Sequence, residues 1–168
     1  RAVSDQIVAG TDVVALLRTT GTATPAQGEP NPVGVTVWGV DEGFIKLQSL
    51  PTLPADRLLI NAALARDLHV KAGDEIALSV NRPRSIGLDS LFARRKLAEV
   101  MATLTLPVAA VLPDNGPGDF RLDGQSGRPR NAFLPREALQ RALTMPSKAN
   151  VLVAPVQQGD SSDLTAAL

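Results

Sequence analysis

His69 is the single imidazole of the 168-residue chain, so any Ser-His-Asp arrangement or histidine-based metal site would have to include it. It falls at the end of a short predicted helix, where a cation interacts favourably with the carbonyl end of the helix dipole. No second His, no Cys and no carboxylate pair at ligand spacing accompanies it. Zinc and iron sites are therefore not expected, and a structural position at the helix end is favoured over a catalytic one.

Two acidic pairs, Asp41-Glu42 and Asp74-Glu75, each lie where a turn meets a strand. Neighbouring residues of a strand point to opposite faces, so neither pair forms a general acid/base couple, and both are expected to be solvated turn carboxylates. The glycine-rich segments 116–119 and 124–127 lack the Lys-Ser/Thr ending of a phosphate-binding loop. We therefore predict no catalytic residue, no metal site and no cofactor.

The segment from Arg82 to Lys96 has the most unusual composition in the chain. Before residue 81 there are 6 basic and 9 acidic residues, whereas after residue 80 there are 11 basic and 8 acidic residues. A protruding loop with apolar residues beside these cations could dock on an acidic partner or on lipid headgroups, and a plain solvated loop is the more frequent alternative. The residues predicted to contact a partner are Arg82, Arg84, Leu91, Phe92, Arg94, Arg95 and Lys96.

Composition excludes several classes of protein. The chain has 17 Lys+Arg, 17 Asp+Glu, no Cys, no Tyr and 3% aromatic residues. A net charge of zero removes the long-range attraction on which nucleic-acid binders depend, so no nucleic-acid partner is expected. The 44% apolar content indicates a globular fold, and 13 Gly with 13 Pro indicate many turns. The length suits one domain or two small lobes that pack together.

No segment of the sequence is apolar for long enough to span a bilayer. The longest uncharged stretch, 100–113, has 14 residues and includes two Thr and two Pro, whereas a spanning helix needs about 20 apolar residues. The N-terminus shows no basic region followed by an apolar region, so no signal peptide is predicted. Because the chain begins with Arg1 rather than Met, we expect a piece of a longer or processed protein.

The first half of the chain predicts four strands and a helix. Apolar residues 13–17 and the alternating segment Val33 to Val40 are expected to pair as a hairpin, with residues 19–32 as its loop. Residues 57–60 form a short buried strand, and Asn61 is a good N-cap for a helix that ends at His69. Gly73-Asp74 then supplies a turn before the strand 75–80.

The second half predicts three further strands and short helices. Asp89 can cap a short helix, and residues 101–112 form a long strand that is kinked or bulged at Pro107 and therefore near a sheet edge. Residues 113–130 are a long loop, followed by a strand at 132–134, a helix from Pro135 to Leu143 and a last strand at 150–154. Short strands outnumber helices, so the fold class is α+β with a mixed sheet or two small sheets.

Five segments follow one another in an order that is typical of a known family. They are VWGVDEGF at 37–44, LLINAALARDLHVKAGDEI at 58–76, the strand end at 108–113, AFLPREALQ at 132–140 and NVLV at 150–153. In this series the chain resembles the extracytoplasmic, MacB-like domain of FtsX-like ABC transporter permeases. The resemblance covers most of residues 33 to 154.

This resemblance implies a two-lobed domain inserted between the first and second membrane helices of a permease. Residues 1–54 and 145–168 would form the membrane-proximal lobe, and residues 55–144 the distal lobe. The domain would be non-catalytic and extracytoplasmic, and would couple ATP-driven motion of the membrane helices to the handling of substrate. Its partners would be the ATP-binding subunit, reached through the membrane part, and an adaptor or substrate protein. The resemblance is also compatible with a dimer of the intact permease.

Two alternatives from other classes stay open. A secreted hydrolase fragment would need a Ser hydroxyl and a carboxylate within hydrogen-bond reach of His69. A soluble ligand-binding module would need a concave apolar pocket around Trp38 and Phe44 with converging polar groups, rather than a solid core.

Overall fold

The computed structural model describes residues 13–28, 31–82, 101–122 and 127–154. Along the chain, the elements are β1 (Val14–Pro25), β2 (Val33–Val40), α1 (Glu42–Leu47), β3 (Leu58–Asn61), α2 (Ala62–Leu68), β4 (Glu75–Asn81), β5 (Met101–Leu112), η2 (Gly116–Asp119), β6 (Asn131–Pro135), α4 (Arg136–Leu143) and β7 (Val151–Val153). The short helix predicted after Asp89 lies outside the described residues.

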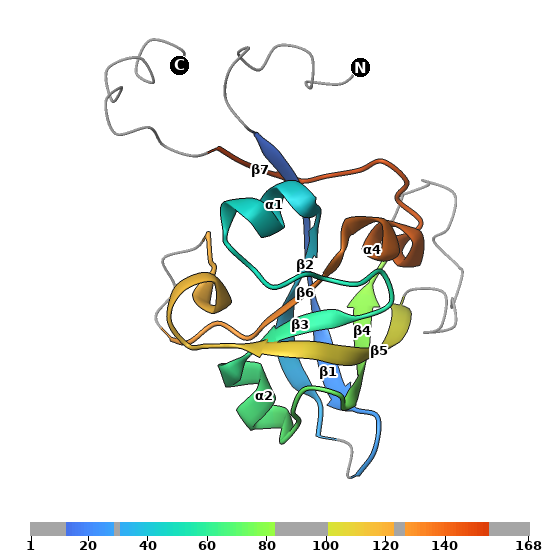
Figure 1. The fold of residues 1–168 in the computed structure, drawn as a ribbon. Helices are drawn as coiled ribbons and strands as arrows, with labels where there is room; N and C mark the ends of the chain where they lie inside the picture. The colour runs from blue at the N-terminus through green and yellow to red at the C-terminus, as the bar shows by residue number, and fades with distance from the viewer. Residues whose placement is uncertain (1–12, 29–30, 83–100, 123–126, 155–168) are drawn as a thin grey trace, which may run out of the picture.

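The seven strands form one mixed sheet in the order β2-β6-β3-β5-β4-β1-β7, and a further pairing joins β1 back to β2 (Figure 1). The β2–β6 and β3–β5 pairs are parallel, whereas β1 is antiparallel to β2, β4 and β7. The expected mixed sheet with short helices is therefore confirmed. Strands from both expected lobes share this sheet, and the division into two lobes stays a prediction.

Two clusters of buried side chains hold the elements together. The first lies against α2 and α4 and includes Val35 and Val37 of β2. The second lies against α1 and includes Trp38 and Val40 of the same strand. Alternate residues of a strand point to opposite faces, so the second half of β2 is buried on both sides, with Trp38 only 1% exposed.

The strand β1 is longer than the sequence predicts. Residues 19–25, which were expected to belong to a loop, continue the strand and pair with both β2 and β4. The loop prediction is wrong because Gly21 acts as a close-approach residue: a Cβ there would collide with the carbonyl oxygen of Ser79 on β4. Thr20, Thr22 and Thr24 are β-branched and suit an extended strand.

The strand β5 lies between β3 and β4, so the expectation that it runs near a sheet edge is wrong. Residues 101–107 pair with β4, and residues from Val108 onward pair with β3. Pro107, which has no N–H to donate, sits where the strand changes partner. The expected irregularity lies just after Pro107. Val108 pairs with Leu58 and Ala110 pairs with Leu59, so the register shifts between these two residues of β3.

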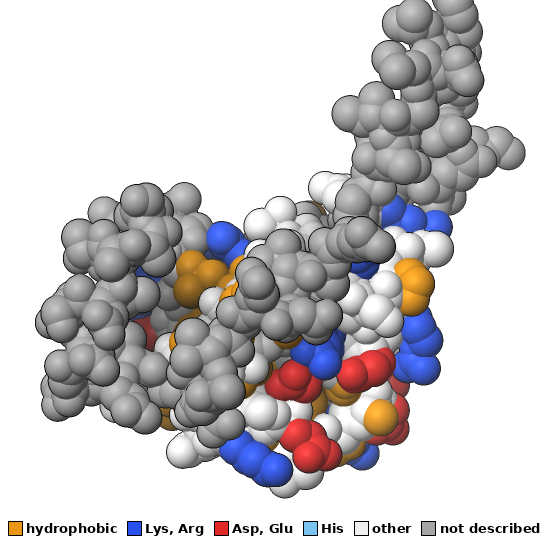
Figure 2. Space-filling model, turned by 90° about the horizontal axis from the view of Figure 1, so that it is seen from above, with side chains coloured by type: hydrophobic (Ala, Val, Ile, Leu, Met, Phe, Trp, Pro, Cys, Tyr) orange, Lys and Arg blue, Asp and Glu red, His pale blue; other side chains and the backbone are white. Residues whose placement is uncertain are grey.

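Several local predictions are confirmed. The Asn61 side chain accepts a hydrogen bond from the Leu64 N–H and caps α2, and Gly73 has a φ of +95° in the turn before β4. Helix α4 begins at Arg136, one residue later than expected, because Pro135 still belongs to β6. The face seen in Figure 2 mixes basic and acidic side chains, as the net charge of zero suggests.

The start of β1 and the strand β7 lie together at the top of Figure 1. Val14 pairs with Val153, and Leu16 pairs with Val151, in antiparallel register. The Asn150 side chain adds two bonds to β1, because its Oδ1 accepts from the Arg18 N–H at 2.7 Å and its Nδ2 donates to the Arg18 carbonyl at 2.8 Å. The described part of the chain therefore begins and ends on two paired strands.

Candidate functional site

The predicted partner-contact segment lies mostly outside the described residues. Arg82 is described, and its Nε donates a hydrogen bond of 3.1 Å to the carbonyl of Ala142 near the end of α4. The other six residues of the prediction, Arg84, Leu91, Phe92, Arg94, Arg95 and Lys96, are not described. Their proposed role in docking stays a prediction.

His69 occupies a structural position at the end of α2. It is the exposed C-cap residue, has a φ of 56° and a ψ of 40°, and its backbone N–H bonds to the carbonyl of Arg66. Among the described residues, no Ser hydroxyl or carboxylate is hydrogen-bonded to its imidazole. The hydrolase alternative therefore finds no supporting geometry in this part of the chain.

The Asp41 carboxylate is not the solvated turn residue that the sequence suggested. Its Oδ1 accepts from the Phe44 N–H at 3.0 Å and caps α1, a helix that the sequence analysis did not predict. Its Oδ2 accepts from Arg136 Nη1 at 2.7 Å, and the same nitrogen donates to the Ala15 carbonyl. The expectation of a solvated carboxylate is wrong because Asp41 bonds to Arg136, which is 95 residues away in the sequence. Local sequence does not reveal such a partner. Glu42, by contrast, is exposed and pairs with Lys46 on the same helix.

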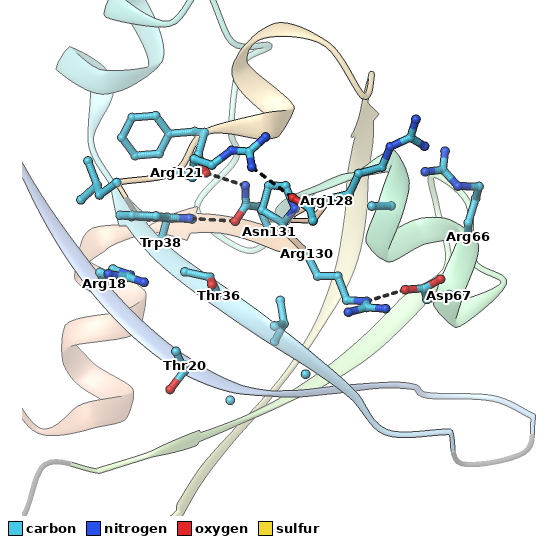
Figure 3. A pocket seen from close by; sticks show the side chains of 18 residues that line it. Arg18, Thr20, Thr36, Trp38, Arg66, Asp67, Arg121, Arg128, Arg130 and Asn131 are labelled. Atoms are coloured by element: carbon cyan, nitrogen blue, oxygen red, sulfur yellow. Dashed lines mark hydrogen bonds and ion pairs between the residues drawn. The ribbon is translucent and has the colours of Figure 1, made fainter. Parts of the chain in front are cut away.

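A pocket of about 790 Å³ lies beside Trp38, between the β1–β2 hairpin, α2 and the segment that leads into β6 (Figure 3). We call it the arginine pocket, because five of its lining residues are arginines and one is an aspartate. The residues that line it are Arg18, Thr20, Gly21, Gly34, Val35, Thr36, Trp38, Ala63, Arg66, Asp67, Phe120, Arg121, Leu122, Gly127, Arg128, Pro129, Arg130 and Asn131.

One wall of the arginine pocket is a strand face with a period of two. Arg18 pairs with Trp38, and Thr20 pairs with Thr36, across the antiparallel β1–β2 hairpin. The Arg18 guanidinium carbon lies 5.6 Å from the centroid of the Trp38 ring, within the range of a cation–π interaction. The wall therefore presents a cation on an aromatic ring, followed by two hydroxyl-bearing residues.

The base of the arginine pocket is held by two buried asparagines, Asn131 and Asn61, which are 1% and 0% exposed. Asn131 Oδ1 accepts from Trp38 Nε1 at 3.1 Å, while its Nδ2 donates to the carbonyls of Gly118 and Phe120. Asn61 Oδ1 accepts from the Asn131 N–H at 3.1 Å. Buried amides that are satisfied in this way fix their neighbours, so the Trp38 wall is preorganised.

An aromatic cluster supports Trp38 and fills the space in which the ligand-binding alternative placed an apolar pocket. Phe120 meets the rings of Trp38 and Phe44 edge to face, at 4.9 and 5.1 Å between centroids. Phe44 is fully buried and stacks on Phe133. Phe44 therefore belongs to a solid core, whereas the hollow beside Trp38 is lined by five arginines as well as by apolar side chains such as Val35 and Leu122.

The opposite side of the arginine pocket is organised by two carboxylates. Arg66 Nη1 and Arg128 Nη1 lie 2.7 and 3.3 Å from the same oxygen, Asp114 Oδ2. Arg130 pairs with Asp67 of α2. The hydrogen bond from Arg66, followed by the charges of Arg66 and Arg128, lowers the pKa of Asp114, and the same bond raises the pKa of Arg66. Asp114 therefore stays ionised and holds two guanidinium groups side by side.

This site is not predictable from local sequence, because its residues come from distant segments of the chain. Arg121, Arg128 and Arg130 all lie in or beside the loop between β5 and β6, which was interpreted as a plain turn-forming loop. The basic excess after residue 80 was assigned to the segment from Arg82 to Lys96 alone. The sequence feature that could have indicated this site is Arg128-Pro129-Arg130, which places two arginines directly before a strand.

A second hollow, of about 910 Å³, lies at the far end of β1. We call it the His69 hollow. Its lining residues are Pro25, Gln27, Gly28, Asn31, Leu68, His69, Val70, Gly73, Asp74 and Glu75. The Asp74 carboxylate accepts from the Lys71 N–H at 2.9 Å, so this acidic residue closes a turn. The His69 hollow is therefore built from this turn and from the adjoining ends of β1, α2 and β4, and the backbone of the turn also bonds to Val108 of β5.

Within the described ranges, no three His, Cys, Asp or Glu side chains gather as metal ligands would. No helix in the same part of the chain has both the length and the apolar character needed to cross a membrane.

Two solved structures with a similar fold are an extracellular and a periplasmic domain of ABC transporters. The extracellular domain of the noncanonical ABC-type transporter YknZ from Gram-positive bacteria aligns with a TM-score of 0.52 and 12% identity, over 92% of this chain and 68% of that one. The periplasmic region of MacB from Actinobacillus actinomycetemcomitans aligns with a TM-score of 0.53 and 8% identity, over 92% of this chain and 61% of that one. No family model and no curated protein sequence matches the chain. The resemblance to extracytoplasmic, MacB-like domains is thus confirmed at the level of the fold.

Proposed function

We propose that this chain is a non-catalytic, extracytoplasmic domain of an ABC transporter permease, placed between two membrane segments. The observation that carries this proposal is the pairing of Val14 with Val153, because the described part of the chain begins and ends on neighbouring strands. Paired residues of antiparallel strands have Cα atoms about 5 Å apart. A domain with such ends can be inserted between two adjacent membrane helices without separating them. The fold shared with YknZ and MacB domains agrees with this placement.

The same arrangement suggests how the domain could respond to motion in the membrane. β1 runs from the paired ends into the middle of the fold, where it pairs with both β2 and β4. A displacement of the ends would move the sheet rather than a free loop, since packed strands shift together. In this proposal the ATP-binding subunit acts through the membrane helices, and the outer half of the domain contacts substrate or an adaptor protein. The intact permease is a dimer in the same scheme, with a membrane-proximal and a distal lobe.

The side of the membrane on which the domain lies gives the first test. The chain contains no Cys, so a Gln27→Cys variant adds one exposed thiol to this domain at the turn between β1 and β2. In intact cells that produce the full-length protein, a membrane-impermeant maleimide should label this thiol. Labelling that occurs only after the cells are permeabilised would place the domain on the cytoplasmic side and refute the proposal. The unsubstituted protein, treated in the same way, gives the background.

The coupling role needs a separate test. Because Val14 and Val153 are neighbours, a short Gly/Ser linker can replace the residues between them and leave the adjoining segments at their natural spacing. We expect the ATP-binding subunit still to co-purify and to hydrolyse ATP, while transport is lost. Transport at the normal rate by a complex that lacks the domain would contradict the coupling role.

A further inference from the structure

The arginine pocket gathers positive charge in a protein whose net charge is zero. Five arginines line it, against Asp67 in the lining and Asp114 behind it. Asp67 forms an ion pair with Arg130, and a single oxygen of Asp114 pairs with both Arg66 and Arg128. Two like charges held side by side by one carboxylate repel each other, and a second anion between them would relieve this repulsion.

We propose that the arginine pocket binds the phosphate group of a ligand. The ion pairs of Arg66 and Arg128 each use Nη1 alone, and a guanidinium has five N–H donors in a planar fork. The remaining edges of both groups can therefore bind oxygen atoms in the bidentate manner that suits phosphate. Figure 3 shows these guanidinium groups at the rim of the pocket, across from Trp38 and Thr36.

The rest of the pocket suits such a ligand without rearrangement. Thr20 and Thr36 face each other in the β1–β2 hairpin and supply hydroxyl groups, and the Asn131 network fixes Trp38 as a flat wall. Ligand pockets commonly measure about 300–1,000 Å³, and the volume of about 790 Å³ falls in that range. Several guanidinium groups on one site favour a doubly charged phosphate over a single carboxylate. The phosphate could belong to a soluble phosphate ester or to a lipid headgroup.

This inference goes beyond the transporter proposal and does not depend on it, because it concerns a binding site that the 168-residue chain contains. Isothermal titration calorimetry of that chain with pyrophosphate tests it. We expect saturable binding that weakens as salt is added, since the guanidinium groups are partly exposed. Arg66→Ala and Arg128→Ala should each weaken binding by about tenfold to a hundredfold, as expected for the loss of a charge-assisted hydrogen bond.

Matched variants separate a site from a general charge effect. Arg141→Ala removes an exposed arginine of α4 that does not line the pocket, and should leave pyrophosphate affinity unchanged. Arg128→Lys keeps the charge and loses the planar fork, so it should weaken binding less than Arg128→Ala. Unfolding midpoints of all variants check that each remains folded. Absence of binding at millimolar pyrophosphate, or an equal loss in Arg141→Ala, would overturn the proposal.

Two further probes identify the source of the phosphate. If the chain sediments with phosphatidylglycerol vesicles but not with phosphatidylcholine vesicles, and Arg128→Ala abolishes this, the phosphate is that of an anionic lipid headgroup. If pyrophosphate binds and such vesicles do not, the ligand is a soluble phosphate ester. Hexaglutamate that binds more tightly than pyrophosphate would overturn the proposal in favour of an acidic peptide.

Discussion

The arginine pocket and the His69 hollow are similar in volume but are built in different ways. The arginine pocket is lined by five arginines and one aspartate, and its base is a network of buried amides. The His69 hollow is lined by His69 with Asp74 and Glu75, and its walls are turns at the ends of β1 and α2. In the arginine pocket the Trp38–Asn131 bond joins residues 93 apart, whereas in the His69 hollow the Lys71–Asp74 bond joins residues three apart.

This difference shows how the side chains that shape each surface depend on the whole fold. A bond between distant residues forms only when the sheet is assembled, so the geometry of the arginine pocket is a property of the tertiary structure. The Lys71–Asp74 side-chain bond forms with local backbone geometry, and at the His69 hollow only backbone bonds among those described, such as Gly73 to Val108, reach a distant strand. Substitutions at comparable positions in the two regions should therefore differ in their effect on stability.

The largest effect is expected for Asn131→Ala. This change removes the acceptor of the buried Trp38 N–H and the donor to the Gly118 and Phe120 carbonyls. Buried groups that lose their partner destabilise by about 1–3 kcal/mol each, so we expect the free energy of unfolding to fall by about 3 kcal/mol. Urea denaturation followed by Trp38 fluorescence measures it.

Asn115→Ala is the control for this prediction. Asn115 is exposed at the start of η2, and its side chain makes no capping bond. Its replacement should change stability by less than about 0.5 kcal/mol. If Asn131→Ala were as mild as Asn115→Ala, the amide network would not be what holds the base of the arginine pocket.

A pair of glycine substitutions compares the two regions directly. Gly21 lines the arginine pocket, and a Cβ there would collide with the Ser79 carbonyl oxygen of the neighbouring strand. Gly73 lines the His69 hollow, where a Cβ would meet open space but the φ of +95° strains any other residue. We expect Gly21→Ala to destabilise by about 2–3 kcal/mol because β1 and β4 must separate. Gly73→Ala should destabilise by about 1 kcal/mol. Thermal unfolding of the two variants side by side measures the difference, and equal effects would contradict the comparison.

Acid should weaken the carboxylate side of the arginine pocket. Arg66 holds the pKa of Asp114 below its ordinary value in the folded protein, so the folded state binds this proton less readily than the unfolded state does. The resulting stabilisation is present above the ordinary aspartate pKa of about 3.9 and is lost as the pH falls through the lower value in the folded state. Asp114→Asn should therefore lower the unfolding midpoint at neutral pH and lose less stability than the unsubstituted protein on acidification. Parallel acid dependence in the two proteins would contradict this prediction.

Much of the fold could be predicted because its signals are local. The alternation of residues 33–40, the Asn61 cap and the Gly73-Asp74 turn each act within a few residues, and each is present in the structure. The extension of β1 to Pro25 could not be predicted in this way. Glycine is typical of turns, so Gly21 does not by itself indicate a strand. Its place in a strand follows from the close approach of Ser79 on β4.

The candidate site was not predictable for a related reason. Arg18 and Arg66 come from β1 and α2, whereas Arg121, Arg128 and Arg130 come from the segment before β6. Parallel pairing of β2 with β6 brings these segments together, with Trp38 aligned to Phe133. The residue pattern within a single segment does not show which strand it will pair with. Arginines that are dispersed in the sequence therefore come together in space.

The smallest effect is expected in the His69 hollow. His69 is exposed and has a φ of 56° at the end of α2, a conformation that favours glycine over any residue with a Cβ. We expect His69→Gly to leave stability unchanged or to raise it by about 0.5 kcal/mol, because relief of backbone strain is partly offset by the greater freedom of glycine in the unfolded chain. His69→Ala, which keeps the strain and removes the imidazole, is the control. If both variants lost more than about 1 kcal/mol in urea denaturation, the imidazole itself would make a stabilising contact, and the side chains of the His69 hollow would be coupled to the fold as those of the arginine pocket are.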